Sequence, residues 1–145
     1  MKISKNKFLG MLVFLLISSI SISGQYKDAL ISRMNDFRNS VFANVDEGND
    51  FQEKEALRKM EKEWDKELNI VYQKIMKVAD AVTKNKLRNA QRAWIKFRDS
   101  EVEKSYYTNN PNGGSMGILF SLNTAAKLTE ERAVQLAEMY DALDK

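Results

Sequence analysis

Two acidic residues have a spacing that could support chemistry. Glu61 and Asp65 lie four residues apart in a highly charged segment, so a helix would place both carboxylates on one face. Paired carboxylates are the groups that hydrolyse glycosidic bonds. Acid pairs at this spacing are common on charged helices, and nothing in the sequence indicates that this pair is tuned for catalysis. We therefore interpret both residues as part of a solvated helix face.

Two aromatic residues, Trp94 and Phe97, lie one helical turn apart in the stretch AQRAWIKFRDSE, Ala90–Glu101. Aromatic side chains at this spacing among other apolar residues are predicted to belong to the core of a helical protein. A buried indole N–H needs a hydrogen-bond acceptor, for which Asn69 and Gln91 are the candidates.

An Arg-Asp pair, Arg98 and Asp99, follows these aromatics directly. Neighbouring residues on a helix point about 100° apart, so we expect each to pair with a residue of another helix. Arg132 is the expected partner of Asp99, because a guanidinium can hold a carboxylate through two parallel hydrogen bonds. A structural clamp between helices is the preferred interpretation, and ligand recognition is the alternative.

Several classes of function are excluded by composition, because the chain contains neither histidine nor cysteine. Histidine-dependent triads, histidine metal sites and disulfide bonds are therefore ruled out. The acidic run DEGND, 46–50, is too short for a calcium loop and lacks the closing glutamate. We predict a protein that is not an enzyme and has no catalytic residue, cofactor or metal site.

Residues 1–24 have the order of features found in a secretory signal peptide. Three lysines precede an apolar run from Phe8 to Ile17, and small residues suited to cleavage follow. The run is too short for a membrane span, although a retained anchor is the alternative. These lysines account for the whole excess of 23 Lys+Arg over 20 Asp+Glu, so the mature chain is neutral. We expect a periplasmic or secreted protein without a membrane span in the mature chain, and no nucleic-acid partner.

Residues 25–145 are predicted to form one all-α domain, a small bundle of four to five helices without a disulfide. The first helical segment runs from about Tyr26 to Val45. The second begins with Asp50 as N-cap and Glu53 in a capping-box-like pairing, and a turn or a kink is predicted near 84–86. The apolar stripes of these two segments are Leu30, Met34, Phe37 and Val41, then Leu57, Met60, Trp64, Leu68, Val71, Ile75, Val78 and Val82.

The third and fourth helical segments are joined by the loop TNNPNGGSMG. Ser115 is predicted to cap the fourth segment, and Thr129 a second start within it. Loops carry binding residues more often than helices, and paired glycines let a partner approach the backbone closely. The loop is therefore the candidate partner-binding site, although a tight helix connection is a compatible alternative. Its candidate residues are Asn109, Asn110, Asn112, Gly113, Gly114 and Ser115. The stripe of the third segment is Leu87, Ala90, Trp94, Phe97, Val102 and Tyr106, and that of the fourth is Leu119, Phe120, Leu122, Leu128, Leu136, Met139 and Leu143.

Three sequence blocks point to a known family. They are WDKELNIVYQKIM at 64–76, LRNAQRAWIKFRDSE at 87–101 and GGSMGILFSLNTAAKLTEERAVQL at 113–136. Together they resemble the N-terminal domain of the LprI lysozyme-inhibitor family over residues 52–142. The resemblance implies an exported helical domain whose named member inhibits lysozyme. The matching positions are Leu68, Asn69, Tyr72, Gln91, Trp94, Arg98, Asp99, Gly113, Gly114, Ser115, Leu128, Thr129 and Arg132.

The chain departs from this family pattern at Val102 and Thr124, where many members carry cysteine. If those cysteines pair in the relatives, a staple between the third and fourth helices is missing here. Such a staple contributes roughly 3 kcal/mol, and burial of Val102 recovers part of it. We expect the fold to survive the exchange.

The sequence leaves two functional hypotheses and the oligomeric state open. The first is an exported, non-enzymatic protein that binds a protein partner, with a lysozyme as the candidate target and the loop Thr108–Ser115 as the contact. Animal-type lysozymes are usually basic, so an acidic patch would speed the encounter. The alternative is an envelope structural or assembly module, in which the apolar stripe of the first helix docks to another protein.

Overall fold

The computed structural model describes residues 24–108 and 111–144 and contains four helices. These are α1 (Gln25–Phe42), α2 (Asp50–Val78), α3 (Ala81–Thr108) and α4 (Ser115–Leu143). The described ranges contain no strand, so the predicted all-α bundle is confirmed with four helices. Apart from Gly24, the predicted signal peptide lies outside the described residues. The same is true of Asn109 and Asn110 of the candidate loop.

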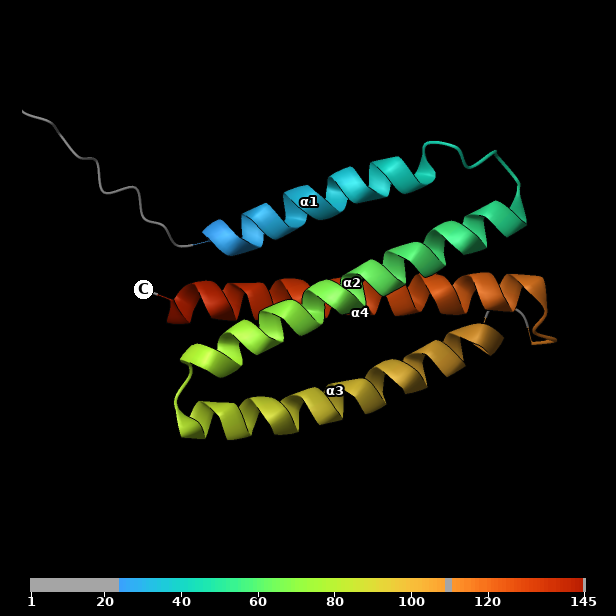
Figure 1. Ribbon diagram of the computed structural model, residues 1–145. Helices are drawn as coiled ribbons and strands as arrows, with labels where there is room; N and C mark the ends of the chain where they lie inside the picture. Colours follow the sequence, from blue (N-terminus) through green and yellow to red (C-terminus); the bar gives the residue numbers. More distant parts are fainter. Residues whose placement is uncertain (1–23, 109–110, 145) are drawn as a thin grey trace, which may run out of the picture.

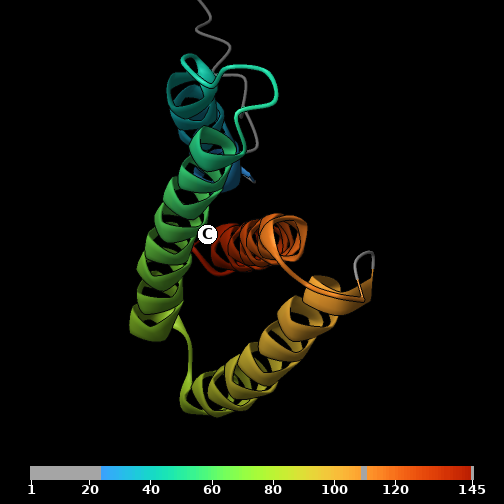
Figure 2. The same ribbon diagram turned by 90° about the vertical axis from the view of Figure 1, so that its right-hand side faces the viewer.

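The last helix in the sequence, α4, is the central helix of the bundle (Figure 1). It packs against α1, α2 and α3, and most extensively against α2. α1 also packs on α2, whereas α3 is held mainly by α4. Seen from the end, α2 and α3 diverge like the arms of a V with α4 between them (Figure 2). One side of α3 therefore faces away from the bundle.

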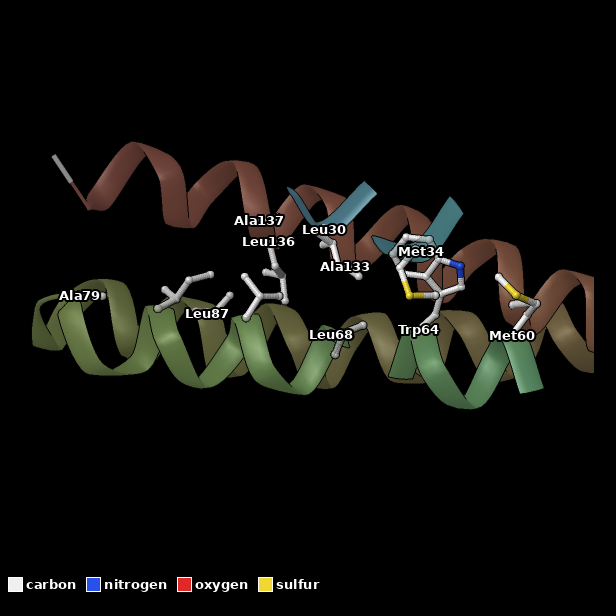
Figure 3. Packing of buried hydrophobic residues seen from close by; sticks show 13 residues of the cluster. Leu30, Met34, Met60, Trp64, Leu68, Ala79, Leu87, Ala133, Leu136 and Ala137 are labelled. Carbon is white, nitrogen blue, oxygen red and sulfur yellow. The ribbon is translucent and has the colours of Figure 1, made fainter. Parts of the chain in front are cut away.

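The core lies where α2 meets α4, with contributions from α1 and α3 (Figure 3). α2 supplies large side chains, including Trp64 and Leu68, which are 2% and 3% exposed. α4 supplies small ones, including Ala133 and Ala137, and these let the two backbones approach closely. The predicted stripe of α2 is buried from Met60 to Ile75. Val78 is exposed, and Val82, which was predicted in the same stripe, lies on α3 and is also exposed.

α1 is an integral part of this bundle. Its predicted stripe faces inward, with Leu30 and Met34 buried and Phe37 packed against the core. The N-terminus of α1 is capped by α4, because Asp141 accepts hydrogen bonds from the backbone N–H groups of Tyr26 and Lys27, both at 2.9 Å. The apolar stripe of α1 is thus covered within the chain. It is not left free for docking to another protein, as the assembly hypothesis requires.

The turn between α2 and α3 lies at Ala79 and Asp80, so the prediction of a turn near 84–86 is wrong. Asp80 accepts a hydrogen bond from the backbone N–H of Thr83 at 2.6 Å, which fixes the start of α3. Residues 84–86 lie within the first turns that follow. Their polar character reflects exposure on a helix that is covered on one side only.

The predicted helix caps are also corrected. Asn49, and not Asp50, caps α2, since its side chain accepts a hydrogen bond from the backbone N–H of Gln52 at 3.1 Å. Ser115 is the first residue of α4 and makes no capping bond there. Thr129 does not start a second helix, because α4 is continuous and the buried hydroxyl donates to the Ala125 carbonyl at 2.7 Å.

α3 buries a narrower face than its sequence predicts. Leu87 and Gln91 are buried, and Trp94 is half-buried against the core. Phe97 is 52% exposed and Ala90 is exposed, so the prediction that they belong to the core is wrong. The reason is that only α4 packs extensively on α3, which leaves its other side without a covering helix.

The cap that α4 provides for α1 can be tested with Asp141→Ala. Loss of the acceptor for two backbone N–H groups should lower the free energy of unfolding by about 1–2 kcal/mol. The matched control is Asp36→Ala, which removes an exposed carboxylate of α1 that pairs with no other described residue. Urea unfolding measures both variants. Equal stability of the two would contradict the capping role of Asp141.

Candidate functional site

The α1–α2 and α3–α4 connections meet at one end of the molecule (Figure 1). The side chain of Lys54 lies 2.6 Å from the Asp50 carboxylate and also donates to the hydroxyl of Ser115. That hydroxyl in turn donates to Asp50. A hollow of about 380 Å³ lies beside these groups, lined partly by Gly48 and Met116. We call this surface, made of residues 46–53 and 112–119, the loop end.

The paired glycines of the candidate loop allow the backbone conformation of the turn between α3 and α4. Gly113 and Gly114 have φ values of +66° and +83°, which L side chains rarely adopt. The backbone N–H of Gly114 donates to the Tyr106 hydroxyl at 3.0 Å. A Cβ on Gly117 would lie 2.7 Å from the Tyr106 carbonyl oxygen. The compatible structural interpretation of the loop, a tight connection between helices, therefore has a clear geometric basis.

The loop end is acidic and partly apolar. Residues 43–53 contain four acids and no base, and residues 105–126 contain no charged residue. Hydrogen bonds from Lys54 and Ser115 hold the pKa of Asp50 below its usual value, so this carboxylate stays charged. Phe51 is 73% exposed beside these acids, and Met116 is 49% exposed. The negative charge of the DEGND run, 46–50, is the sequence signal for this acidic surface.

A second hollow lies between α2 and α3, the two arms of the V (Figure 2). It has a volume of about 420 Å³. Its lining includes six residues of the family motif: Leu68, Asn69, Tyr72, Gln91, Trp94 and Arg98. We call this hollow the motif groove. Residues from two separate sequence blocks are thus brought together in one place.

Arg98 organises the wall of the motif groove. Its guanidinium lies over the Trp94 ring, 5.1 Å from the centroid, and contacts Asp99 at 2.8 Å and Asp65 at 4.0 Å. Asp99 therefore pairs with its own neighbour. The predicted Asp99–Arg132 clamp is wrong.

Arg132 reaches α3 at a different residue. Its Nε donates to the Gln91 side-chain oxygen at 3.0 Å, and burial lowers the pKa of its guanidinium. Asn69 donates its amide N–H groups to the backbone carbonyl and the carboxylate of Asp65, and the Gln91 side-chain oxygen accepts from Arg132. Within the described residues, neither candidate accepts a hydrogen bond from the Trp94 indole. The indole N–H of Trp64 is buried and has no hydrogen-bond partner among the described residues.

The burial of Glu61 differs from the prediction that it belongs to a solvated helix face. It is half-buried, and burial followed by the nearby charge of Asp65 raises its pKa, while Arg98 opposes the shift. Asp65 lines the motif groove and is only partly exposed. Within the described ranges, no three acidic residues are grouped as a metal site would require. The pair is thus an electrostatic partner of Arg98.

The two positions at which the family resemblance implies cysteine lie on helices that pack together. Val102 is on α3 and Thr124 is on α4, and both are half-buried. The α3–α4 contact therefore holds by packing and by the Arg132–Gln91 hydrogen bond.

Gly117→Ala tests the close approach of α4 to Tyr106. The added methyl group would overlap the Tyr106 carbonyl oxygen, and we expect a loss of about 1–3 kcal/mol in stability. This exceeds the gain of up to about 1 kcal/mol that alanine brings to a helix. Ser121→Ala is the control, since it alters an exposed hydroxyl that bonds only its own helix. Thermal unfolding measures both, and a stabilised Gly117→Ala variant would contradict the close packing.

Glu61→Gln tests the electrostatics of the motif groove. A raised pKa means that the folded state binds the proton more tightly, so the wild type loses stability as pH rises above 4.5, the usual pKa. The free energy of unfolding of the variant, measured in urea, should therefore rise relative to that of the wild type between pH 4 and pH 7. Glu103→Gln, at an exposed position, is the control for which we expect no such trend. If the stability difference between Glu61→Gln and the wild type did not change with pH, the raised pKa of Glu61 would be contradicted.

Comparison with known proteins identifies the family. The family model described as lysozyme inhibitor LprI matches residues 43–136. No curated protein and no solved structure matches the chain. The matched region includes the acidic connection between α1 and α2, which lies before the start of the resemblance seen in the sequence. Because this family model matches more than half of the residues of the chain, the chain belongs to the LprI lysozyme-inhibitor family.

Proposed function

We propose that this chain is an exported, non-enzymatic protein that inhibits a lysozyme by contact through the loop end. The observation that carries the proposal is the acidic and apolar surface formed where the candidate loop meets the start of α2. Four acids and the exposed Phe51 lie within residues 43–53. Membership of the LprI family supports a lysozyme as the target.

The physical route is complementary charge followed by apolar contact. A basic lysozyme of the animal type is attracted to the acidic residues Asp46, Glu47 and Glu53, which raises the association rate. Phe51 offers the kind of aromatic anchor that contributes most of the binding energy in protein interfaces. A bound inhibitor at the substrate cleft would then block the enzyme by occlusion.

The loop end is held in place before binding. Asp50, Lys54 and Ser115 join the starts of α2 and α4, and Tyr106 holds the backbone of the turn. A surface that is already ordered loses little conformational entropy on association. Export supports the same function, because it would place the protein where it meets an external lysozyme. Among the described residues, no helix is long and apolar enough to cross a bilayer.

The test is lysozyme turnover in the presence of residues 25–145, which contain all four helices. We expect dose-dependent inhibition at low salt. Replacing Asp46, Glu47 and Glu53 by the corresponding amides should weaken inhibition by about tenfold, through a slower association rate. The matched control neutralises Asp36, Glu103 and Glu131, which are exposed elsewhere and carry the same charge.

Full lysozyme activity at every dose would contradict the proposal. Equal loss of inhibition in the two triple variants would locate the contact away from the loop end. A stable homodimer without any effect on lysozyme would instead favour the assembly module.

A further inference from the structure

The outer side of α3, meaning the side that α4 does not cover, carries an unbalanced positive charge, and part of this side borders the motif groove. Residues 81–98 contain six lysines and arginines and no acidic residue, in a chain whose remaining charges are mixed. Arg98 is engaged by Asp65 and Asp99. The other five make no ion pair with any residue in the described part of the chain. We call them the basic face of α3: Lys84, Lys86, Arg88, Arg92 and Lys96.

Large apolar side chains are interleaved with these cations. Val82 is 63% exposed, Phe97 is 52% exposed and Ile95 is 41% exposed. Exposure of three large apolar side chains on one helix is unfavourable in water, and such exposed patches often mark binding surfaces. Ile95, like Arg88 and Arg92, lies at the motif groove, whereas Val82 and Phe97 do not line it. Because α4 is the only helix that packs extensively on α3, the outer side of α3 can meet an extended surface (Figure 2).

We propose that the basic face of α3 binds the surface of an anionic phospholipid bilayer, with α3 lying along it. Cationic side chains interleaved with Phe and aliphatic residues are the features of helices that bind at the headgroup boundary. Lys and Arg are attracted to the anionic headgroups, and Phe97 and Val82 enter the boundary layer. A soluble polyanion would satisfy the cations equally well but would leave these apolar side chains in water, which favours the lipid surface.

The basic face and the loop end lie on different parts of the molecule. The cations precede residue 99, whereas the acidic residues of the loop end lie beyond the other end of α3 (Figure 1). Occupation of one surface therefore leaves the other accessible. Lipid binding and lysozyme inhibition are separate properties that can fail separately.

The experiment is sedimentation of residues 25–145 with vesicles of phosphatidylcholine, with or without a quarter of phosphatidylglycerol. We expect binding to the anionic vesicles only, and its loss at high salt. The variant Lys86→Glu, Arg92→Glu, Lys96→Glu should bind about tenfold more weakly. The matched control Lys59→Glu, Lys62→Glu, Lys77→Glu changes the charge equally on exposed, unpaired positions of α2 and should bind as the wild type does.

Phe97→Ser separates a bilayer from a soluble polyanion, with heparin as the polyanion probe. The substitution should weaken vesicle binding and leave heparin binding unchanged. Heparin binding without vesicle binding would overturn the proposal in favour of a polyanion. Equal binding to neutral vesicles, or equal loss in the two triple variants, would also overturn it. Circular dichroism confirms that each variant is folded, and retained lysozyme inhibition shows that the loop end is intact.

Discussion

The close contact between α2 and α4 is the constraint on which the rest of the structure depends. Large side chains of α2, such as Trp64 and Leu68, pack against a face of α4 that is rich in alanine. Small residues on one helix and large ones on the other let the two helix axes approach closely. The chain has no cysteine, so this packing takes the place of covalent stapling. α1 and α3 are then added on separate sides of the central helix.

Polar contacts between distant segments join α4 to each of the other three helices. Asp141 caps α1, and Arg132 holds Gln91 of α3. At the other end, Ser115 joins Asp50 and Lys54. Each contact links α4 to a different helix. The same central helix that forms the core thus also sets the geometry of the loop end and of the motif groove.

The neutral overall charge of the chain from residue 25 conceals a separation of charge. Acids gather at the loop end, and cations gather on the outer side of α3. The separation survives folding because α4 is the only helix that packs extensively on α3. The five cations of the basic face form no ion pair within the described part of the chain. The two surfaces therefore present opposite chemistry to different partners, and a net charge of zero gives no guide to either of them.

The sequence by itself determined the helical class, the stripe that buries Met60 to Ile75, the family and the polar turn near Gly113. These features depend on local periodicity and on backbone preferences that are written in adjacent residues. Tertiary structure alone decided that Phe97 is exposed, that Arg132 meets Gln91 and not Asp99, and that Ser115 lies beside Asp50. A periodic stripe shows which side of a helix is apolar, but only the neighbouring helices decide how much of it is covered. Because α3 has one extensive neighbour and α2 has two, similar patterns in the two helices led to different burial.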